Sequence, residues 1–247
     1  MDIVLLEAKG LVKSYGGRRV VDGVSIVVHD REIVGLLGRN GAGKTTTFRM
    51  AIGMIRPDGG QVAFEGQEIT RMPMYRRAQL GIGYLSQEPS VFQRMTVEQN
   101  LLAILETMSL TRRERHERAG ALIEQFSLDR VRKQQARVLS GGERRKLEIA
   151  RALITNPSLI LLDEPFSGVD PIAVEDLQRE ILRLNQERGI SILITDHNVM
   201  QTLEVCHHSY IIYEGKVMAY GRPRQLINDP LVRKTYLGDT FRGDEFD

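Results

Sequence analysis

One glycine-rich segment combines residue types at the spacing that phosphate binding requires. It fits the phosphate-loop pattern without a mismatch, in the order Gly38-Arg39-Asn40-Gly41-Ala42-Gly43-Lys44-Thr45. Glycines let the backbone curl until successive N–H groups point at phosphate oxygens, and the helix expected to begin at Lys44 adds its own unpaired N–H groups. Lys44 would reach the β- and γ-phosphates as a candidate catalytic residue, and Thr45 would ligate Mg²⁺. We count the next residue, Thr46, with the nucleotide-binding residues. A turn that merely joins a strand to a helix is the weaker interpretation, because a buried strand is expected directly before the loop. The segment by itself therefore predicts binding of a nucleotide phosphate with Mg²⁺.

Two adjacent carboxylates, Asp163 and Glu164, follow the apolar run Leu159–Leu162. Open α/β sheets bind ligands at the carboxyl ends of their strands, and neighbouring strand residues point to opposite sides. Asp163 is therefore predicted to serve the metal ion through water, while Glu164 polarises the attacking water as general base. An Asp-Glu pair by itself is usually a solvated turn, and its place after a buried run favours the functional interpretation.

Three single residues receive a role only from their placement. His197 ends the apolar run Ile190–Ile194 and could hydrogen-bond a γ-phosphate, although it could equally cap the following helix. Gln87 closes the apolar run Ile82–Leu85, where a neutral amide can reach Mg²⁺ or its water. Tyr15 could stack on adenine, but its spacing alone leaves it unassigned.

Ser140-Gly141-Gly142 opens a second predicted helix and is the most informative stretch of the chain. A helix start offers unpaired N–H groups and a serine hydroxyl to an incoming phosphate. An ordinary N-cap followed by flexible glycines is the alternative. The nucleotide held by the phosphate loop could hardly reach this second surface within one chain. Two such surfaces per chain predict two chains that sandwich two ATP molecules.

Composition narrows the classes of protein. The 247 residues are 42% hydrophobic, which supports a substantial core, and 34 basic against 32 acidic side chains give a net charge of +2. This balance argues against a nucleic-acid partner. The single cysteine, Cys206, cannot form an internal disulfide and indicates a reducing compartment. Since no apolar stretch approaches the ~20 residues that span a bilayer, any membrane role is expected to go through a partner.

The pattern of elements predicts an α/β fold with a helical insert. Short strands with turns at Gly16-Gly17 and Asp22-Gly23 fill the first third, and a helix is expected from Lys44 to about Met54. Asp170, Pro171 and Gly189 mark the start and end of a helix between two buried strands. Residues 89–156 instead show helical stripes and two capping boxes, Thr96 with Gln99 and Thr111 with Glu114.

Together these motifs resemble the ATP-binding cassette family over essentially the whole chain. Tyr15 stands where that family has its adenine-stacking aromatic, Gln87 where it has its Q-loop, and His197 where it has its switch histidine. Leu139–Glu143 is similar to the signature motif and Ser167-Gly168-Val169-Asp170 to the D-loop. The resemblance implies a P-loop NTPase with a RecA-like core, an antiparallel β subdomain and an inserted α-helical subdomain. It implies one domain over 1–247, with 1–88 and 157–247 forming the core and β subdomain and 89–156 the helical subdomain. It also implies a head-to-tail homodimer formed on ATP binding.

Within that family the chain resembles the ATPases of bacterial lipopolysaccharide exporters in the runs Gly81–Glu88, Asp163–Pro171, Thr195–Val199 and Val232–Phe241. This resemblance implies two integral membrane permease subunits that dock in a groove near Gln87 and Phe92. It also places the chain in the cytoplasm, on the cytoplasmic face of the inner membrane. Gln93 and Ser86 depart from the arginine and proline expected there. Branched-chain amino-acid importer ATPases share much of the pattern and stay an alternative. A soluble cassette acting on ribosomes or DNA, and a regulatory subunit without turnover, are further alternatives.

Overall fold

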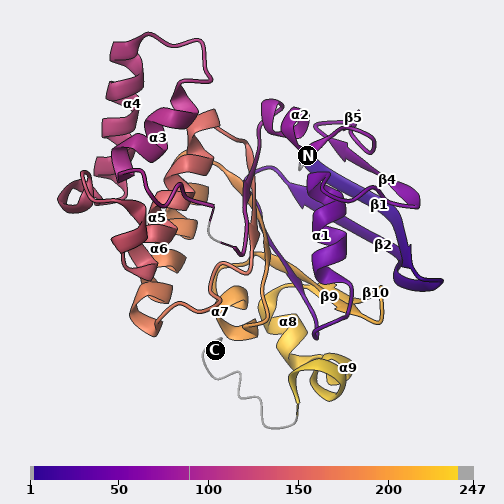
Figure 1. The fold of residues 1–247 in the computed structure, drawn as a ribbon. Helices are drawn as coiled ribbons and strands as arrows, with labels where there is room; N and C mark the ends of the chain where they lie inside the picture. The colour runs from indigo at the N-terminus through magenta and orange to yellow at the C-terminus, as the bar shows by residue number, and fades with distance from the viewer. Residues whose placement is uncertain (1–2, 89, 239–247) are drawn as a thin grey trace.

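The computed structural model describes residues 3–88 and 90–238, which form two sheets with helices around them (Figure 1). The antiparallel sheet has the order β2 (Arg18–His29), β1 (Val4–Tyr15), β4 (Gly59–Phe64) and β5 (Gln67–Glu68). The second sheet has six strands in the order β10 (Lys216–Gly221), β9 (His208–Tyr213), β3 (Ile33–Leu37), β8 (Ser191–Thr195), β7 (Leu159–Asp163) and β6 (Ile82–Leu85). All of its pairings are parallel except that of β10 with β9.

The six-stranded sheet is covered on both faces. Every residue of β3, β7 and β8 is buried, which explains why these segments read as continuous apolar runs. Successive strand residues point to opposite faces, so Ile160 and Leu162 pack toward the helices while Leu159 and Leu161 pack toward α1 and the antiparallel sheet. The sheet thus separates two apolar cores and presents the carboxyl ends of its parallel strands along one edge.

The helices follow from local signals in the sequence. The capping boxes at Thr96 and Thr111 are both formed, and they start α3 (Val97–Leu105) and α4 (Arg112–Gln125). Asp170 caps α6 (Pro171–Arg188), which ends at Gly189 in the left-handed conformation. In Figure 1 these helices and α5 (Gly141–Ala152) lie together on the side of the molecule away from the antiparallel sheet. The remaining helices are α1 (Lys44–Ile52), α2 (Met74–Gln79), α7 (Val199–Leu203), α8 (Pro223–Asn228) and α9 (Pro230–Val232).

One predicted turn is wrong. Asp22-Gly23 does not reverse the chain, because β2 continues through it from Arg18 to His29. Gly23 instead takes a positive φ of 75° at a register shift between β1 and β2, where Leu11 pairs with Val24 and Val12 with Asp22. A glycine at such a bulge gives the same local sequence signal as a turn. The predicted turn at Gly16-Gly17 is present, and the helix expected from Lys44 to about Met54 ends at Ile52.

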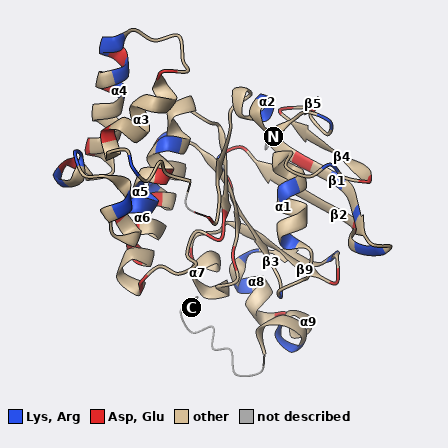
Figure 2. Cartoon of the chain, viewed as in Figure 1, with Lys and Arg blue, Asp and Glu red and all other residues tan. Residues whose placement is uncertain are grey.

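Charged side chains of both signs lie on the helical side and on the sheet side of the molecule, with no single basic face in this view (Figure 2). Among the described residues, every helix is too short or too polar to pass through a lipid bilayer.

Candidate nucleotide-binding site

The phosphate loop joins β3 to α1 in a conformation that glycines alone allow at two points. Gly38 has a φ of 148°, and a Cβ there would lie 2.2 Å from the Ile212 carbonyl oxygen. Gly43 has a φ of 106°, and its Cβ would lie 2.5 Å from the Val20 carbonyl oxygen. Backbone packed this closely cannot move to admit a side chain. The loop is therefore fixed by its contacts with β2 and β9, and its curled backbone lines a ligand site.

Lys44 lies inside this loop. Its side chain is buried, and its ammonium group donates hydrogen bonds to the carbonyl oxygens of Gly38 and, at 3.1 Å, Arg39. Burial lowers the pKa of Lys44, while the nearby carboxylates of Glu164 and Asp196 act in the opposite direction. The amine is thus held at the first turn of α1, where a phosphate would meet it.

The strand order brings the predicted carboxylates, histidine and glutamine to one edge of the sheet. β6, β7 and β8 are neighbouring parallel strands, so the residues that follow them meet at the carboxyl edge. Asp163 is buried and accepts a hydrogen bond from the Tyr84 hydroxyl at 3.4 Å. Burial raises the pKa of the Asp163 carboxyl, and the positive charge of Arg49 partly offsets this. Glu164 takes a left-handed φ of 47°, and its N–H donates to the Thr195 carbonyl oxygen at 2.7 Å.

One carboxylate oxygen of Glu164 contacts both Gln87 and His197. Glu164 Oε2 accepts a hydrogen bond from Gln87 Nε2 at 2.8 Å and lies 3.5 Å from His197 Nδ1. His197 Nδ1 also lies 3.3 Å from Asp196 Oδ1. The carboxylate is therefore oriented from both sides, as a group that must accept a proton from a positioned water requires.

A cleft of about 590 Å³ contains most of the residues that the sequence singled out. It is lined by Tyr15, Asn40, Gly41, Ala42, Gly43, Lys44, Thr45, Thr46, Gln87, Glu164 and His197, together with Val20. Val20 was not predicted, since an apolar residue in a strand carries no signal for a ligand. Tyr15 is 49% exposed, so its ring is open to stacking.

Three predicted residues lie next to this cleft without lining it. Gly38 is packed beneath the loop, and Asp163 is buried at the end of β7. Arg39 lines a neighbouring hollow of about 610 Å³ with Arg18, Tyr213 and Glu214. The hollow shares Val20, Asn40, Gly41 and Ala42 with the nucleotide cleft, so the two adjoin at the loop.

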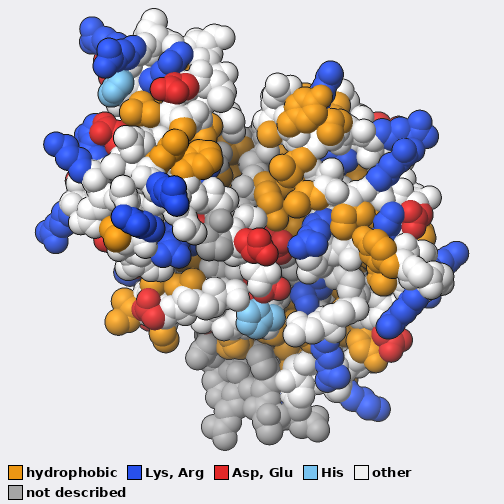
Figure 3. Space-filling view, viewed as in Figure 1, with side chains coloured by type: hydrophobic (Ala, Val, Ile, Leu, Met, Phe, Trp, Pro, Cys, Tyr) orange, Lys and Arg blue, Asp and Glu red, His pale blue; other side chains and the backbone are white. Residues whose placement is uncertain are grey.

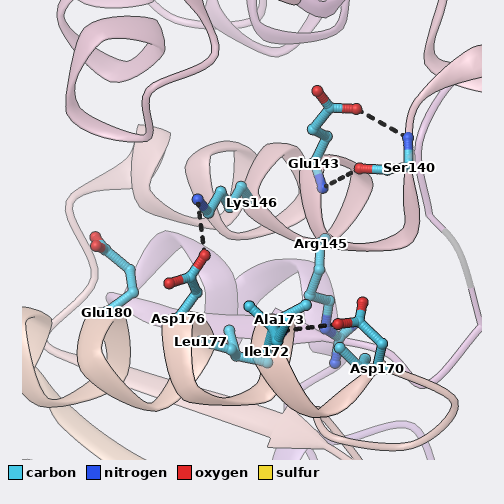
Figure 4. A pocket seen from close by; sticks show the side chains of 12 residues that line it. Ser140, Glu143, Arg145, Lys146, Asp170, Ile172, Ala173, Asp176, Leu177 and Glu180 are labelled. Carbon is cyan, nitrogen blue, oxygen red and sulfur yellow. Dashed lines mark hydrogen bonds and ion pairs between the residues drawn. The ribbon is translucent and has the colours of Figure 1, made fainter.

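Ser140, Gly141 and Gly142 belong to a different part of the surface. Ser140 and Gly142 line a cleft of about 280 Å³ between α5 and α6, whose other lining residues include Asp170, Ile172 and Glu180 (Figure 4). Ser140 Oγ accepts a hydrogen bond from the Glu143 N–H at 3.2 Å, and Glu143 Oε2 accepts one from the Ser140 N–H at 2.9 Å. Because the hydroxyl oxygen acts as acceptor in the helix cap, its proton remains available to a ligand. The chain does not bring this turn to its own nucleotide cleft.

Buried polar groups that sequence reasoning missed hold the loops of the site. Asp196 is fully buried and accepts hydrogen bonds from the N–H groups of Phe166 at 3.0 Å and Asn198 at 2.9 Å, which joins the loops after β7 and β8. Arg145 and Glu148 form a buried ion pair on α5 and bind the backbone of Ser86 and Ser90 on either side of Gln87. Their spacing of three residues indicates a helical pair, but no sequence signal shows that the pair is buried.

Side chains in and behind the cleft could hold a metal ion together with phosphate oxygens. Among the residues described, no group of three or more His, Cys, Asp or Glu side chains is placed to hold a metal ion. Mg²⁺ is usually bound through one or two carboxylates and completes its shell with water, phosphate and other oxygens. Thr45 and Gln87 line the cleft, and Asp163 lies behind it, which is a donor set of this kind.

Comparisons with known proteins agree with this geometry. A sequence profile of the family described as ABC transporter matches residues 21–167. The lipopolysaccharide export system ATP-binding protein LptB of Haemophilus influenzae is 53% identical over 239 residues, covering 96% of this chain and 99% of the relative. The protein of the same name from Escherichia coli K12 is 50% identical over 238 residues, covering 96% and 98%.

Solved structures show the same fold. The ATP-binding cassette of an ABC transporter, determined in its ADP conformation, superposes with a TM-score of 0.85 at 30% sequence identity. That alignment covers 96% of this chain and 99% of the other. The predicted α/β class with a P-loop core, an antiparallel sheet and additional helices is confirmed. The profile match and the near-complete alignments establish that this chain belongs to the ABC transporter family as an ATP-binding, ATP-hydrolysing subunit.

Proposed function

We propose that this chain is the ATPase subunit of a lipopolysaccharide exporter and works as a homodimer that ATP closes and hydrolysis reopens. The observation that carries the dimer is the separation of the two surfaces. The nucleotide cleft holds Lys44, Glu164 and His197, whereas Ser140 and Gly142 line another cleft between α5 and α6. The Ser140 turn of one copy would complete the nucleotide site of the other, in a two-fold arrangement in which each copy gives and receives the same surface.

In this proposal Glu164 accepts the proton of the attacking water, and His197 holds the γ-phosphate and the carboxylate in line. Gln87 donates to the same Glu164 oxygen and so fixes its orientation. Lys44 would neutralise charge on the phosphates. When bound, Mg²⁺ would be held by Thr45 and Gln87 and, through water, by Asp163, and would neutralise phosphate charge. Tyr15 and Val20 would contact the adenine.

The surface around Phe92 supports docking of membrane partners. Phe92 is 46% exposed, and the guanidinium of Arg151 lies 4.7 Å from its ring centroid. Figure 3 shows apolar side chains on both sides of a furrow between the helical part and the sheet part of the molecule. Among the described residues, exposed apolar side chains also occur in the segments around residues 54, 75 and 92, namely Met54, Met74, Tyr75, Leu80 and Met95. Exposed apolar side chains that gather on one face of a protein are typical of an interaction site. We propose that two permease subunits dock here and hold the chain at the cytoplasmic face of the inner membrane.

Two departures from the exporter pattern lie at this surface. Ser86 donates a hydrogen bond to the Glu88 carbonyl oxygen at 2.7 Å, which shapes the segment directly after β6. The Gln93 carbonyl oxygen accepts from the Arg137 N–H at 3.0 Å. We propose 89–156 as the helical subdomain; Pro89 at its boundary and Asp239, Thr240 and Phe241 of the tail lie outside the described residues. The high identity to exporter ATPases favours lipopolysaccharide over amino acids as cargo.

The test of the dimer uses Glu164→Gln, which keeps the side-chain shape but removes the base. We expect this variant to bind ATP, to lose hydrolysis and to double its mass in light scattering when ATP is added. In the same background, Ser140→Asn should abolish the dimer, because asparagine still caps a helix but replaces the hydroxyl. Thr111→Asn makes the same change in the capping box of α4 and should leave the dimer intact. Normal hydrolysis by Glu164→Gln, or a dimer insensitive to Ser140, would contradict the proposal.

The membrane partners are tested separately by affinity purification from detergent-solubilised membranes. Lipopolysaccharide-exporter permeases should co-purify with the tagged chain, and amino-acid permeases or ribosomes in their place would overturn the assignment.

A further inference from the structure

Arg77 is a fully buried arginine whose hydrogen bonds all go to backbone carbonyls. It is 1% exposed. Its Nε donates to Met72 O at 2.9 Å and its Nη2 to Thr70 O at 3.2 Å, both within its own segment before α2. Its Nη1 donates to Met50 O at 3.1 Å and to Ala51 O at 2.6 Å. One planar guanidinium therefore ties two separate parts of the chain together.

The second of these parts is the last turn of α1, the helix that begins at the phosphate loop. The last carbonyls of a helix lack partners within the helix, and a cation at that end also offsets the helix dipole. Burial lowers the pKa of Arg77 to about 10, so the side chain is still charged at neutral pH. Arg77 thus holds the C-terminal end of α1, whose N-terminal end holds Lys44 and Thr45.

Gly53 shows how closely the two parts fit. It ends α1 with a φ of 86°, and a Cβ built on it would lie 2.5 Å from Arg77 Nε and 3.0 Å from the Met72 carbonyl oxygen. A side chain at position 53 would therefore collide with both Arg77 and the backbone before α2.

The outer side of α2 belongs to the surface proposed for the membrane partners. Tyr75 is 61% exposed, Met74 40% and Leu80 37%. The chain then enters β6 at Ile82 and reaches Gln87, whose amide binds Glu164. A partner bound to α2 would thus contact a segment that Arg77 joins to the phosphate-binding helix by hydrogen bonds. The same segment leads through β6 to the catalytic edge of the sheet.

We propose that Arg77 is a positioning residue that fixes the phosphate-binding helix α1 to α2, so that docking of a membrane partner on α2 sets the position of the phosphate loop. This inference rests on the proposed function, because it needs a membrane partner at α2. Its physical basis is a continuous set of hydrogen bonds between two packed elements.

The test compares Arg77→Lys with Arg76→Lys. Lysine keeps the charge but carries its donors on one atom and cannot reproduce the fork that reaches four carbonyls. Arg76 is its exposed neighbour on the same helix, so Arg76→Lys is the matched control. ATP affinity, thermal unfolding and ATPase rate are measured on the isolated subunit, and the ATPase rate is measured again in the purified complex with the permease subunits.

We expect Arg77→Lys to lose stimulation by the permease subunits beyond any change in the basal rate and ATP affinity of the isolated subunit, both compared with Arg76→Lys. Its stimulation by the permease subunits should fall by about 2- to 30-fold, the range for residues that change coupling between sites. Equal stimulation of both variants would overturn the proposal. A fall in basal rate that accounts for the whole loss in the complex would also overturn it, since Arg77 would then be merely structural. If the unaltered subunit is not stimulated by permeases, the proposed function itself fails.

A second pair of variants approaches the same contact from α1. Gly53→Ala and Gly66→Ala both place alanine at a positive φ, 86° and 77°, but a Cβ at Gly66 meets nothing within 4 Å. The backbone strain is similar, so the difference between the variants reports the clash at residue 53, which is closest with the Arg77 side chain and includes the Met72 carbonyl oxygen. Gly53→Ala should reproduce the loss of stimulation and Gly66→Ala should not; the same stimulation in both would refute the role of Arg77.

Discussion

Replacing Glu148 with alanine is expected to destabilise the fold far more than replacing an exposed glutamate would. Glu148 Oε2 lies 2.9 Å from Arg145 Nη1, and its Oε1 accepts the Ser90 N–H at 3.0 Å. The two side chains are 4% and 10% exposed. Arg145 Nε and Nη2 are already buried without a hydrogen-bond partner. In Glu148→Ala the guanidinium would keep only the Ser86 carbonyl oxygen, to which its Nη1 donates at 2.9 Å.

The expected cost follows from leaving a buried charge without its counter-ion. Breaking a buried pair from one side typically costs about 3–5 kcal/mol. For a chain of this size each kcal/mol corresponds to about 2–4 °C in the unfolding midpoint. Glu148→Ala should therefore lower the midpoint by roughly 6–20 °C. Replacing both partners, as Arg145→Met with Glu148→Leu, removes the uncompensated charge and should restore most of the loss.

Urea and thermal unfolding followed by circular dichroism measure the effect. Glu117→Ala is the control, because Glu117 forms an ion pair with Arg113 at 2.7 Å while the two side chains are 59% and 88% exposed. Its removal should leave the midpoint unchanged within error, as exposed pairs contribute little. A Glu148→Ala midpoint equal to that of Glu117→Ala, or a double variant less stable than the single one, would refute the reasoning.

Two further predictions concern pH. Burial raises the pKa of Asp163, so its ionisation opposes folding above its ordinary value of 3.8, and Asp163→Asn should unfold at a higher temperature than the parent at pH 7–8. The gain should vanish below pH 3.8, and a gain that persists there would contradict the explanation. Burial lowers the pKa of His207 from 6.5, and its Nδ1 accepts the Ile33 N–H at 2.9 Å, so folding loses stability as pH falls below 6.5. His207→Gln keeps a hydrogen-bond acceptor that does not titrate. Between pH 6.5 and 5 the free energy of unfolding of this variant should fall less steeply than that of the parent, and the two slopes should differ by at most about 1.4 kcal/mol per pH unit. Identical slopes in urea unfolding would exclude His207 as the cause.

The sequence predicted the fold class and the placement of most candidate residues because their signals are local. The phosphate loop, the capping boxes and the buried strand runs depend on backbone geometry within a few residues, and all of them formed where expected. The parallel strand order then brings Gln87, Glu164 and His197 together, because each of them follows one of three neighbouring strands. Their catalytic and binding roles stay predictions.

Other features depend on contacts between distant segments and left no readable signal. Arg77 follows another arginine in a short helix, yet it is buried because its guanidinium lies at the end of α1, which is 25 residues earlier in the chain. Asp196 stands beside the predicted His197, but its role in joining two loops requires the position of Phe166. Likewise, Gly23 serves a bulge rather than a turn because β1 continues to pair with β2 beyond it.

The left-handed backbone of Glu164 has a consequence for engineering. A non-glycine residue rarely adopts a φ of 47°, and glutamate lacks the short polar side chain that makes asparagine tolerable there. Selection for heat resistance alone would therefore reward glycine or asparagine at this position and yield hardier molecules without the base. A screen for thermostable variants of this ATPase therefore has to measure ATP turnover as well as thermal stability, because the most stable variants would lack activity.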